Sequence, residues 1–446
     1  MIQSRGVSAE PRRSRLLGSA PDLLMVAALI LAVPFLFYMQ RSTGPYLDEW
    51  PLLDDTTSLA PSQLFAQFNG HLMFLAKFAL ALNETIFGYS ARGPLRVVSV
   101  ASHLALAATV YAFLRTRIDR WVALMGAVFV ISAGNGWEIV GVAYSFGWMV
   151  ALAAGICAVI VFERGVSPRD DWLACGLLFA GLLGSGVVYP FIGGLAVQVL
   201  WKDRRIRALR ATAAPIVFVA AYWLLEARES GIDPYGPRQV VDFAFEALTQ
   251  AFGMILARPD TWGPVLFALA AALLARAAAK RDRLTPGQVT VLAIVVLFVF
   301  LTGFARGGFI VPGSSRYTFT LQILFLLVLG EFARDWRPNW NARAAAGVFA
   351  GFAIFFNLGL FADSMYKVRS DWAGTQAYLI AVDRVGIEKA KQSSFQHPFI
   401  AVHYVDFQYE WFENRGGREL LPEGELDPAM QDQVASFENS IREGLQ

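Results

Sequence analysis

The stretch from Asp22 to Gln40, "DLLMVAALILAVPFLFYMQ", is an almost unbroken apolar run near the start of the chain. Its length is about the ~20 residues that an α-helix needs to cross a hydrocarbon layer of ~30 Å. Arg12, Arg13 and Arg15 precede it, as in a signal peptide, but the apolar part is long and no small-residue cleavage site follows. The run therefore predicts a retained first membrane-spanning helix.

Similar apolar runs recur along the rest of the chain. Its 446 residues are 56% hydrophobic and 17% charged, which indicates a protein embedded mainly in lipid. The further runs lie near residues 95–114, 120–134, 139–162, 173–187, 188–200, 211–226, 262–279, 287–304, 317–334 and 343–363. Together with the first run they predict an all-α polytopic membrane protein with about eleven transmembrane helices.

Basic residues gather in every second connection between these runs. The basic connections are "RTRIDR" (Arg115–Arg120), "ERGVSPRDD" (Glu163–Asp171), "WKDRRIRALR" (Trp201–Arg210), "AKRDRL" (Ala279–Leu284) and "RDWRPNWNAR" (Arg334–Arg343). Because Lys and Arg favour cytoplasmic loops, this alternation predicts a cytoplasmic N-terminus and an extracytoplasmic C-terminus. Frequent Ala and Arg indicate a high-GC bacterium, so the predicted localisation is the bacterial inner membrane.

The predicted topology divides the chain into a disordered cytoplasmic lead (residues 1–21), a transmembrane domain (22–363) and a small extracytoplasmic tail (364–446). The first outer loop covers residues 41–94. In it, Ala60–Gly88 repeats apolar residues at helical spacing with polar interruptions, which favours amphipathic surface helices over two further crossings. The tail contains a strand-like run, His397–Phe407, and is expected to pack on the outer loops.

Acidic residues stand at the outer ends of the predicted spans. "GPYLDEWPLLDD" (Gly44–Asp55) opens the first outer loop and contains Asp48 and Glu49, while "GNGWE" (Gly134–Glu138) forms the second outer turn. An isolated acidic pair is most often a solvated loop, and Glu138 alone would be a first-turn acid that the helix dipole favours. Gathered in one vestibule, such carboxylates are suited to remove a proton from an acceptor hydroxyl.

Groups that favour phosphate occur on the same predicted face. His71 and Lys77 lie in the first outer loop, and Arg306 and Arg316 bracket the outer segment "RGGFIVPGSSRY", which ends at Tyr317. A guanidinium is the best side chain for a phosphate, although these arginines would also suit lipid headgroups, and a lone His is more often a hydrogen-bond partner. As a set, the acids and cations predict transfer of a sugar from a lipid-linked phosphate.

The order of these parts resembles the GT-C superfamily of membrane glycosyltransferases. The resemblance is carried by "LDEW" (Leu47–Trp50) after the first span, "FNGH" (Phe68–His71) near the first surface helix, Glu138 in the next outer loop and "SSRY" (Ser314–Tyr317). It implies a polyprenyl-phosphate sugar donor and an envelope glycan, lipid or protein acceptor. Glu138 stands where relatives commonly have an aspartate, and the tail is smaller than the carbohydrate-binding domains of some relatives.

The resemblance also implies roles for individual residues. Asp48 would be the general base, and Glu49 and Glu138 would organise the acceptor or a divalent cation. The donor phosphate would be held by residues of the outer face: Arg306, Arg316, His71, Lys77 and Tyr317. Whether Mg²⁺ or Mn²⁺ takes part stays open, with Asp48, Glu138 and His71 as candidate ligands and no other cofactor expected. A single displacement at the anomeric carbon would invert its configuration.

Two other functions fit the sequence, namely a secondary transporter or lipid flippase, and a non-catalytic scaffold of envelope assembly. Transporters place ionisable residues near the membrane midplane, whereas here only His103 stands well inside a predicted span. No nucleic-acid partner is expected, because the basic residues form no single patch. Cys157 and Cys175 both lie in apolar runs and are expected to be buried thiols.

Overall fold

The computed structural model describes residues 12–45, 49–56, 58–68, 71–88, 91–132, 134–225, 236–279, 283–306, 312–334, 336–393 and 426–445. Over these ranges the chain is helical and has no β-strand; the only strand-like feature there is an isolated antiparallel bridge between Phe68 and His71. The prediction of an all-α protein is therefore confirmed for the described part. The strand-like run His397–Phe407 lies outside it, as do residues 1–11 of the predicted lead.

The helices of the bundle follow the predicted apolar runs. They are α1 (Arg12–Met39), α5 (Gly93–Leu114), α6 (Arg120–Ser132), α7 (Trp137–Gly141), α8 (Phe146–Arg164), α9 (Pro168–Gly184), α10 (Tyr189–Ala196), α11 (Arg205–Leu225), α13 (Pro259–Ala279), α14 (Pro286–Arg306), α15 (Ser315–Phe332) and α16 (Trp340–Val385). Within the described residues, seven helices are long and apolar enough to cross a membrane, and an eighth span results if α6 and α7 are one bent span. The chain is thus a polytopic membrane protein.

The remaining predicted spans coincide with helices that are shorter or less apolar. These are α9, α15 and the short apolar helix Gly186–Leu200, which contains α10. One further helix, α12 (Pro237–Gly253), falls in a segment that the sequence analysis treated as an outer loop, and it packs on α13, α14 and α15.

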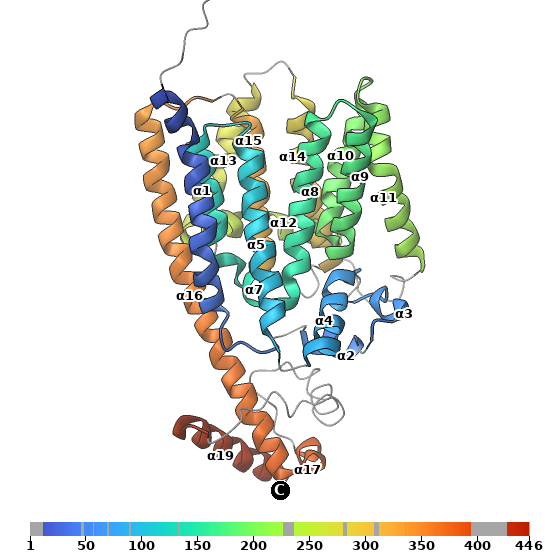
Figure 1. Ribbon diagram of the computed structural model, residues 1–446, viewed down its shortest axis with the longest axis vertical. Helices are drawn as coiled ribbons and strands as arrows, with labels where there is room; N and C mark the ends of the chain where they lie inside the picture. Colours follow the sequence, from blue (N-terminus) through green and yellow to red (C-terminus); the bar gives the residue numbers. More distant parts are fainter. Residues whose placement is uncertain are drawn as a thin grey trace, which may run out of the picture.

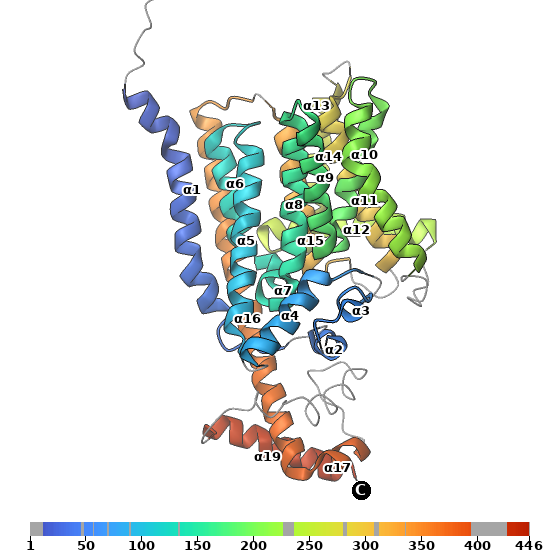
Figure 2. The same ribbon diagram turned by 45° about the vertical axis from the view of Figure 1, so that its right-hand side comes forward.

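The two ends of the bundle differ in chemistry. In Figures 1 and 2, the N-terminal end of α1 and the connections at residues 115–120, 163–171, 201–210 and 334–343 lie at one end, here called the basic end. The helices α2 (Glu49–Asp55), α3 (Pro61–Leu64) and α4 (Phe74–Phe87) lie at the other, here called the surface-helix end. These four basic connections therefore share one end, as the alternation in the sequence predicted, while residues 280–282 of the fifth, Ala279–Leu284, lie outside the described residues.

Helix α16 links the bundle to the C-terminal tail. Its 46 residues correspond to about 70 Å at ~1.5 Å per residue, roughly twice a hydrocarbon layer. It passes the whole bundle and continues beyond the surface-helix end, where α17 (Ile387–Gln392) and α19 (Pro428–Glu443) follow (Figure 1). Residue 364, the predicted start of the tail, lies inside this continuous helix. Tyr378 of α16 packs edge-on against Phe437 of α19, in a small apolar cluster of its own.

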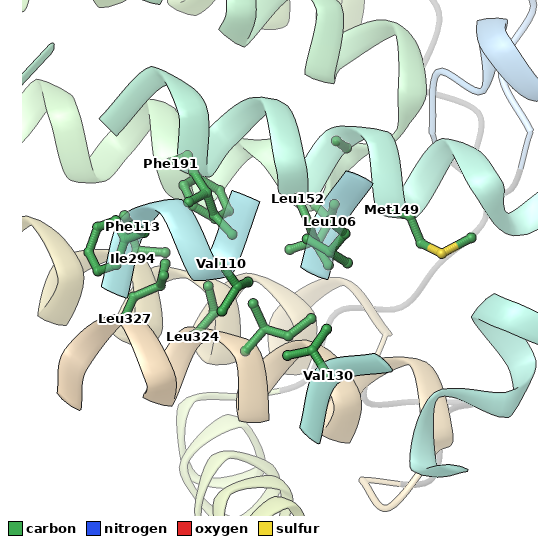
Figure 3. Packing of buried hydrophobic residues seen from close by; sticks show 14 of the residues in the cluster. Leu106, Val110, Phe113, Val130, Met149, Leu152, Phe191, Ile294, Leu324 and Leu327 are labelled. Carbon is green, nitrogen blue, oxygen red and sulfur yellow. The ribbon is translucent and has the colours of Figure 1, made fainter. Parts of the chain in front are cut away.

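The main core is an apolar cluster in the middle of the bundle. Helix α5 lies between α8 and α15, and its side chains meet those of both neighbours (Figure 3). The labelled members are Leu106, Val110, Phe113, Val130, Met149, Leu152, Phe191, Ile294, Leu324 and Leu327. Because lipid is as apolar as these side chains, close packing rather than exclusion of water holds such a core together.

The break between α6 and α7 depends on glycine. A side chain at Gly134 would place its Cβ 2.0 Å from the carbonyl oxygen of Asn357 in α16, so only glycine permits this approach. Gly134–Gly136 form a short 3-10 turn, and α6 and α7 meet at an angle of 41°. This bend places α7, with Glu138, against the start of α15.

Candidate functional site

Helices α2, α3 and α4, from the segment predicted to be the first outer loop, form a layer at the surface-helix end. Leu52 of α2 and Leu80 of α4 are buried in one cluster with Tyr144, next to α8, and Trp372 of α16. The 14 residues of α4 are fewer than the ~20 that a span needs. Exposed large apolar side chains on the same layer are Leu59, Phe65, Phe78, Ile86 and Phe87. The layer thus packs on the bundle with one face and leaves apolar side chains exposed.

Glu138 is held at the first turn of α15. Its carboxylate oxygen Oε2 accepts hydrogen bonds from the hydroxyl of Ser314 (3.3 Å) and the backbone N–H of Arg316 (3.2 Å), and the guanidinium Nε of Arg316 lies 3.6 Å away. In return, the backbone N–H of Glu138 donates to the hydroxyl of Ser315 (3.2 Å). Backbone N–H groups and the helix dipole both favour a carboxylate at this position. The fold therefore brings together two predicted site residues from distant segments.

The Glu138–Arg316 pair stays partly open to solvent. The side chain of Glu138 is 19% exposed and that of Arg316 is 29% exposed. Both charged groups are partly buried but accessible. An anion that reaches them can therefore compete with the carboxylate of Glu138 for the guanidinium of Arg316.

A chain of buried polar side chains lies beneath this pair. The hydroxyl of Thr318 donates to Asn135 Oδ1 (3.0 Å), Asn135 Nδ2 donates to Gln322 Oε1 (3.3 Å), and Gln322 Nε2 donates to the carbonyl of Ala251 (3.0 Å). Thr318 and Gln322 were not predicted as site residues, although polar residues four positions apart on an apolar helix are a usable signal in the sequence. The chain connects the turn before α7 to α12 and α15.

Tyr317 lies on the wall of α15 that faces α8. It is buried, its ring meets that of Trp148 edge-on with centroids 5.6 Å apart, and the guanidinium of Arg316 lies 5.8 Å from its ring centroid. The indole N–H of Trp148 donates to the hydroxyl of Thr320 (2.8 Å). These contacts make Tyr317 part of the packing that supports Arg316.

Glu49, the first residue of α2, is fully buried and forms an ion pair with Arg92, which immediately precedes α5. One turn further along, Arg96 donates to the backbone carbonyl of Thr43 (2.9 Å). Glu49 and the residue just before the acidic segment are thus tied to the start of α5 by two arginines, and the sequence alone did not predict this pairing. Asp48, the predicted base next to Glu49, lies outside the described residues.

Lys77 is placed by contacts within the surface layer. Its side chain is fully buried in α4, and its ammonium donates to the carbonyl oxygens of Gln63 and Ala66, both at 3.2 Å. Desolvation lowers the pKa of Lys77, and the charge of Asp55 acts in the opposite direction. These bonds satisfy carbonyls at the end of α3, so Lys77 contributes to the architecture of the layer.

His71 lies between the surface layer and the start of α10. Its backbone exchanges two hydrogen bonds of 2.9 Å with Phe68, and a Cβ placed on Gly186 would lie 3.1 Å from its ring nitrogen Nδ1. Lys77 and His71 therefore sit on other elements than the Glu138–Arg316 pair, and Tyr317 is the predicted phosphate residue that adjoins Arg316.

Arg306 and a possible metal site complete the set of predicted functional groups. Arg306 ends α14, but its side chain lies outside the description. Among the described residues, no group of three or more His, Cys, Asp or Glu side chains is placed to hold a metal ion. Asp48, one of the candidate ligands, is not in that set, so the divalent-cation hypothesis stays a prediction.

In comparisons with known proteins, no family model and no curated protein matches the chain.

Proposed function

We propose that the chain is a membrane glycosyltransferase of the GT-C type, which moves a sugar from a polyprenyl-phosphate donor to an envelope glycan, lipid or protein. The observation that supports this most directly is the pairing of Glu138 with Arg316, at the end of the bundle that also carries the amphipathic layer α2–α4. A carboxylate and a guanidinium at a membrane surface supply the two charges that phosphate-leaving glycosyl transfer needs.

In the proposed reaction, Asp48 accepts the proton of the acceptor hydroxyl. The acceptor oxygen forms a bond to the anomeric carbon while the bond from that carbon to the donor phosphate oxygen breaks, and its electron pair stays on the phosphate. Arg316 and Arg306 neutralise the phosphate charge that develops. Because one displacement occurs, the anomeric configuration is inverted.

The first turn of α15 is suited to receive the donor phosphate. The hydroxyl of Ser314, the N–H of Arg316 and its guanidinium already converge on one carboxylate oxygen of Glu138. A phosphate oxygen has the same preference for such donors and carries more charge, so it can share or replace the Glu138 contact. Glu138 would then be released to orient the acceptor or, with Asp48 and His71, a divalent cation.

The proposal includes a topology. The eleven apolar runs would all cross a bacterial inner membrane, with the basic end in the cytoplasm and the surface-helix end outside. A polyprenyl-phosphate sugar presented on the outer leaflet would reach Arg316 from the same side as α2–α4.

The test is sugar transfer by the purified protein in nanodiscs, supplied with radiolabelled polyprenyl-phosphate sugars and a cell-envelope lipid extract. Asp48→Asn and Glu138→Gln are each expected to reduce transfer at least about 100-fold. Asp432→Asn, an exposed acid of α19 at the same end, is the matched control and should transfer like the wild type. Activity of Asp48→Asn equal to that of the control would remove Asp48 as the base, and retention of the anomeric configuration would contradict the single displacement.

A second candidate, a lipid flippase or secondary transporter, is favoured by one observation. The bend between α6 and α7 coincides with the buried polar chain through Asn135, and broken helices with buried polar groups are typical of transporters. Movement of fluorescent polyprenyl phosphate between leaflets of proteoliposomes, without sugar transfer, would support this function. Absence of both activities with well-folded protein would favour a scaffold.

A further inference from the structure

An apolar groove lies in the wall of the helix bundle, between α13 and the helices α6, α15 and α16. Its volume is about 440 Å³, and its walls come from α6, α13, α15 and α16. Representative lining residues are Met125, Phe129, Leu273, Phe325, Leu329 and Phe349. We refer to this space as the apolar groove.

The groove is open toward the surroundings of the bundle. The lining side chains of Leu273, Leu329 and Phe349 are 58%, 45% and 47% exposed. All three belong to the membrane-embedded part of the bundle, where exposed apolar groups face hydrocarbon. A single hydrocarbon chain fits the space and its chemistry.

The groove runs along α15 from Gln322, six residues after Arg316, to Ala333 at the basic end of the bundle. More than three turns of α15 separate Arg316 from Leu329, about 20 Å at ~1.5 Å per residue. Its lining includes Leu114 at the end of α5, Ile118 in the basic connection and Ala333 just after α15. A lipid anchored at the Glu138–Arg316 site would have its headgroup at the opposite end of the bundle.

Arginines surround the groove where it reaches the basic end. Arg334 directly follows the lining residue Ala333, and Arg343 stands one turn before the lining residue Ala346. Their side chains are 45% and 37% exposed. Arg334 is oriented by Glu331 (2.9 Å) and Glu163 (3.5 Å), and Arg343 by Asp119 (2.7 Å). A guanidinium has five N–H donors in a planar fork, so a guanidinium that binds a carboxylate can also contact a phosphate.

The connection between these arginines has further features of a membrane interface. Arg337 is exposed, and within the described residues its hydrogen bond is a 3.4 Å contact to the carbonyl of Trp336. Trp336 and Trp340 are 43% and 77% exposed. Exposed tryptophans beside arginines are typical of the headgroup level, where a basic segment attracts anionic lipids.

We propose that the apolar groove binds one hydrocarbon chain of an anionic phospholipid, whose phosphate lies on the arginines of residues 334–343. The lipid comes from the leaflet at the basic end. It is not the sugar donor, since the phosphate of the donor would lie at Arg316, at the other end of α15. It fills the gap between α13 and the helices α6, α15 and α16. This site does not depend on the glycosyltransferase proposal.

The experiment is native mass spectrometry of the full chain in detergent, titrated with phosphatidylglycerol or phosphatidylcholine. Wild type is expected to bind one phosphatidylglycerol more tightly than phosphatidylcholine. Arg337→Gln should weaken phosphatidylglycerol binding about five-fold, as one lost cation near anionic lipid predicts, and leave phosphatidylcholine unchanged. Arg205→Gln, an exposed basic-end arginine on α11, is the control and should change neither.

The chain-binding part is tested by filling the groove. Ala350→Phe, a lining position, should reduce binding of both lipids several-fold, whereas Gly351→Phe should not, because a Cβ at Gly351 meets nothing within 4 Å. If Ala350→Phe impairs folding, photo-crosslinking of the wild type with a diazirine-labelled phosphatidylglycerol replaces it, and α13, α15 and α16 should carry the label.

Three outcomes would overturn the proposal. They are equal lipid binding by Ala350→Phe and Gly351→Phe, an Arg337→Gln effect no larger than that of Arg205→Gln, and label found away from the groove. Binding of polyprenyl phosphate that is lost in Ala350→Phe while phosphatidylglycerol binding persists would also overturn it, and would assign the groove to the donor chain.

Discussion

The carboxylate of Glu138 lies 3.2 Å from the backbone nitrogen of Arg316 and 3.6 Å from its guanidinium. The two residues come from α7 and from the start of α15, and the bend after α6 brings them into contact. Their arrangement joins a carboxylate, a guanidinium and the N-terminus of a helix in one partly exposed place.

Arg316→Lys is expected to reduce sugar transfer roughly 100-fold without loss of folded protein. Lysine keeps the charge but replaces the planar fork, so it cannot hold Glu138 and a phosphate with the same geometry. The measurement is initial transfer rate together with thermal stability, and Arg442→Lys, an exposed arginine of α19, is the control. Equal rates for the two variants would show that Arg316 does not contact the donor.

Lys77→Met is expected to destabilise the layer α2–α4. The change leaves the carbonyls of Gln63 and Ala66 without their donor, at about 1–3 kcal/mol for each buried unsatisfied group. Limited proteolysis of the first outer loop is the direct measurement, and Lys389→Met, an exposed lysine of α17, is the control. Wild-type protease resistance in Lys77→Met would contradict the structural role.

The pH dependence of stability should also differ between wild type and Lys77→Met. The folded protein holds the pKa of Lys77 below its usual 10.5, so the unfolded chain binds more protons between the two values. The free energy of unfolding therefore rises with pH between the two pKa values, because the unfolded state releases more protons than the folded state there. The difference in melting temperature, wild type minus variant, should increase as pH rises toward 10.5. A difference that falls over the same range would contradict the lowered pKa.

Arg117→Met is expected to destabilise the protein by about 3–5 kcal/mol. Its buried guanidinium pairs with both Glu163 and Glu331 at the basic end, and its removal leaves two carboxylates with less compensation. The combined variant Arg117→Met, Glu163→Gln, Glu331→Gln should recover part of the loss, because the two buried carboxylates no longer carry a charge, and Arg334, which also pairs with them, is 45% exposed. Thermal unfolding in nanodiscs measures both, and a combined variant less stable than Arg117→Met would refute the charge explanation.

Gly287→Ala should destabilise the same end by about 1–3 kcal/mol. A Cβ at this position would lie 2.7 Å from Glu163 Oε1 and 2.8 Å from Glu331 Oε2, so the carboxylates would have to move. Gly359→Ala in α16 is the control, since its Cβ meets nothing within 4 Å and alanine favours a helix. Similar melting temperatures for the two variants would mean that the carboxylates of Glu163 and Glu331 can move aside without a loss of stability.

Helix positions were largely predictable from the sequence, whereas residue pairings were not. The apolar run at 287–304 became α14 (Pro286–Arg306), because hydrophobic length is a local property. Helix α12 was not predicted, because charged and polar residues interrupt its short apolar pattern. Its apolar side chains are buried only because the helix packs on α13, α14 and α15. The sequence predicted that Glu49, Glu138 and Arg316 lie on one face of the membrane domain, but it did not predict which residue each of them pairs with.

By itself, the sequence determined that this chain is an all-α protein of the membrane, with its basic connections at one end and its surface helices at the other. Apolar length and charge bias suffice for this, because each span responds to the bilayer independently. Only the tertiary structure decided that Glu138 meets Arg316, that Glu49 meets Arg92, and that Lys77 serves backbone carbonyls. Such pairs depend on how helices pack, and packing is set by contacts between residues far apart in the chain.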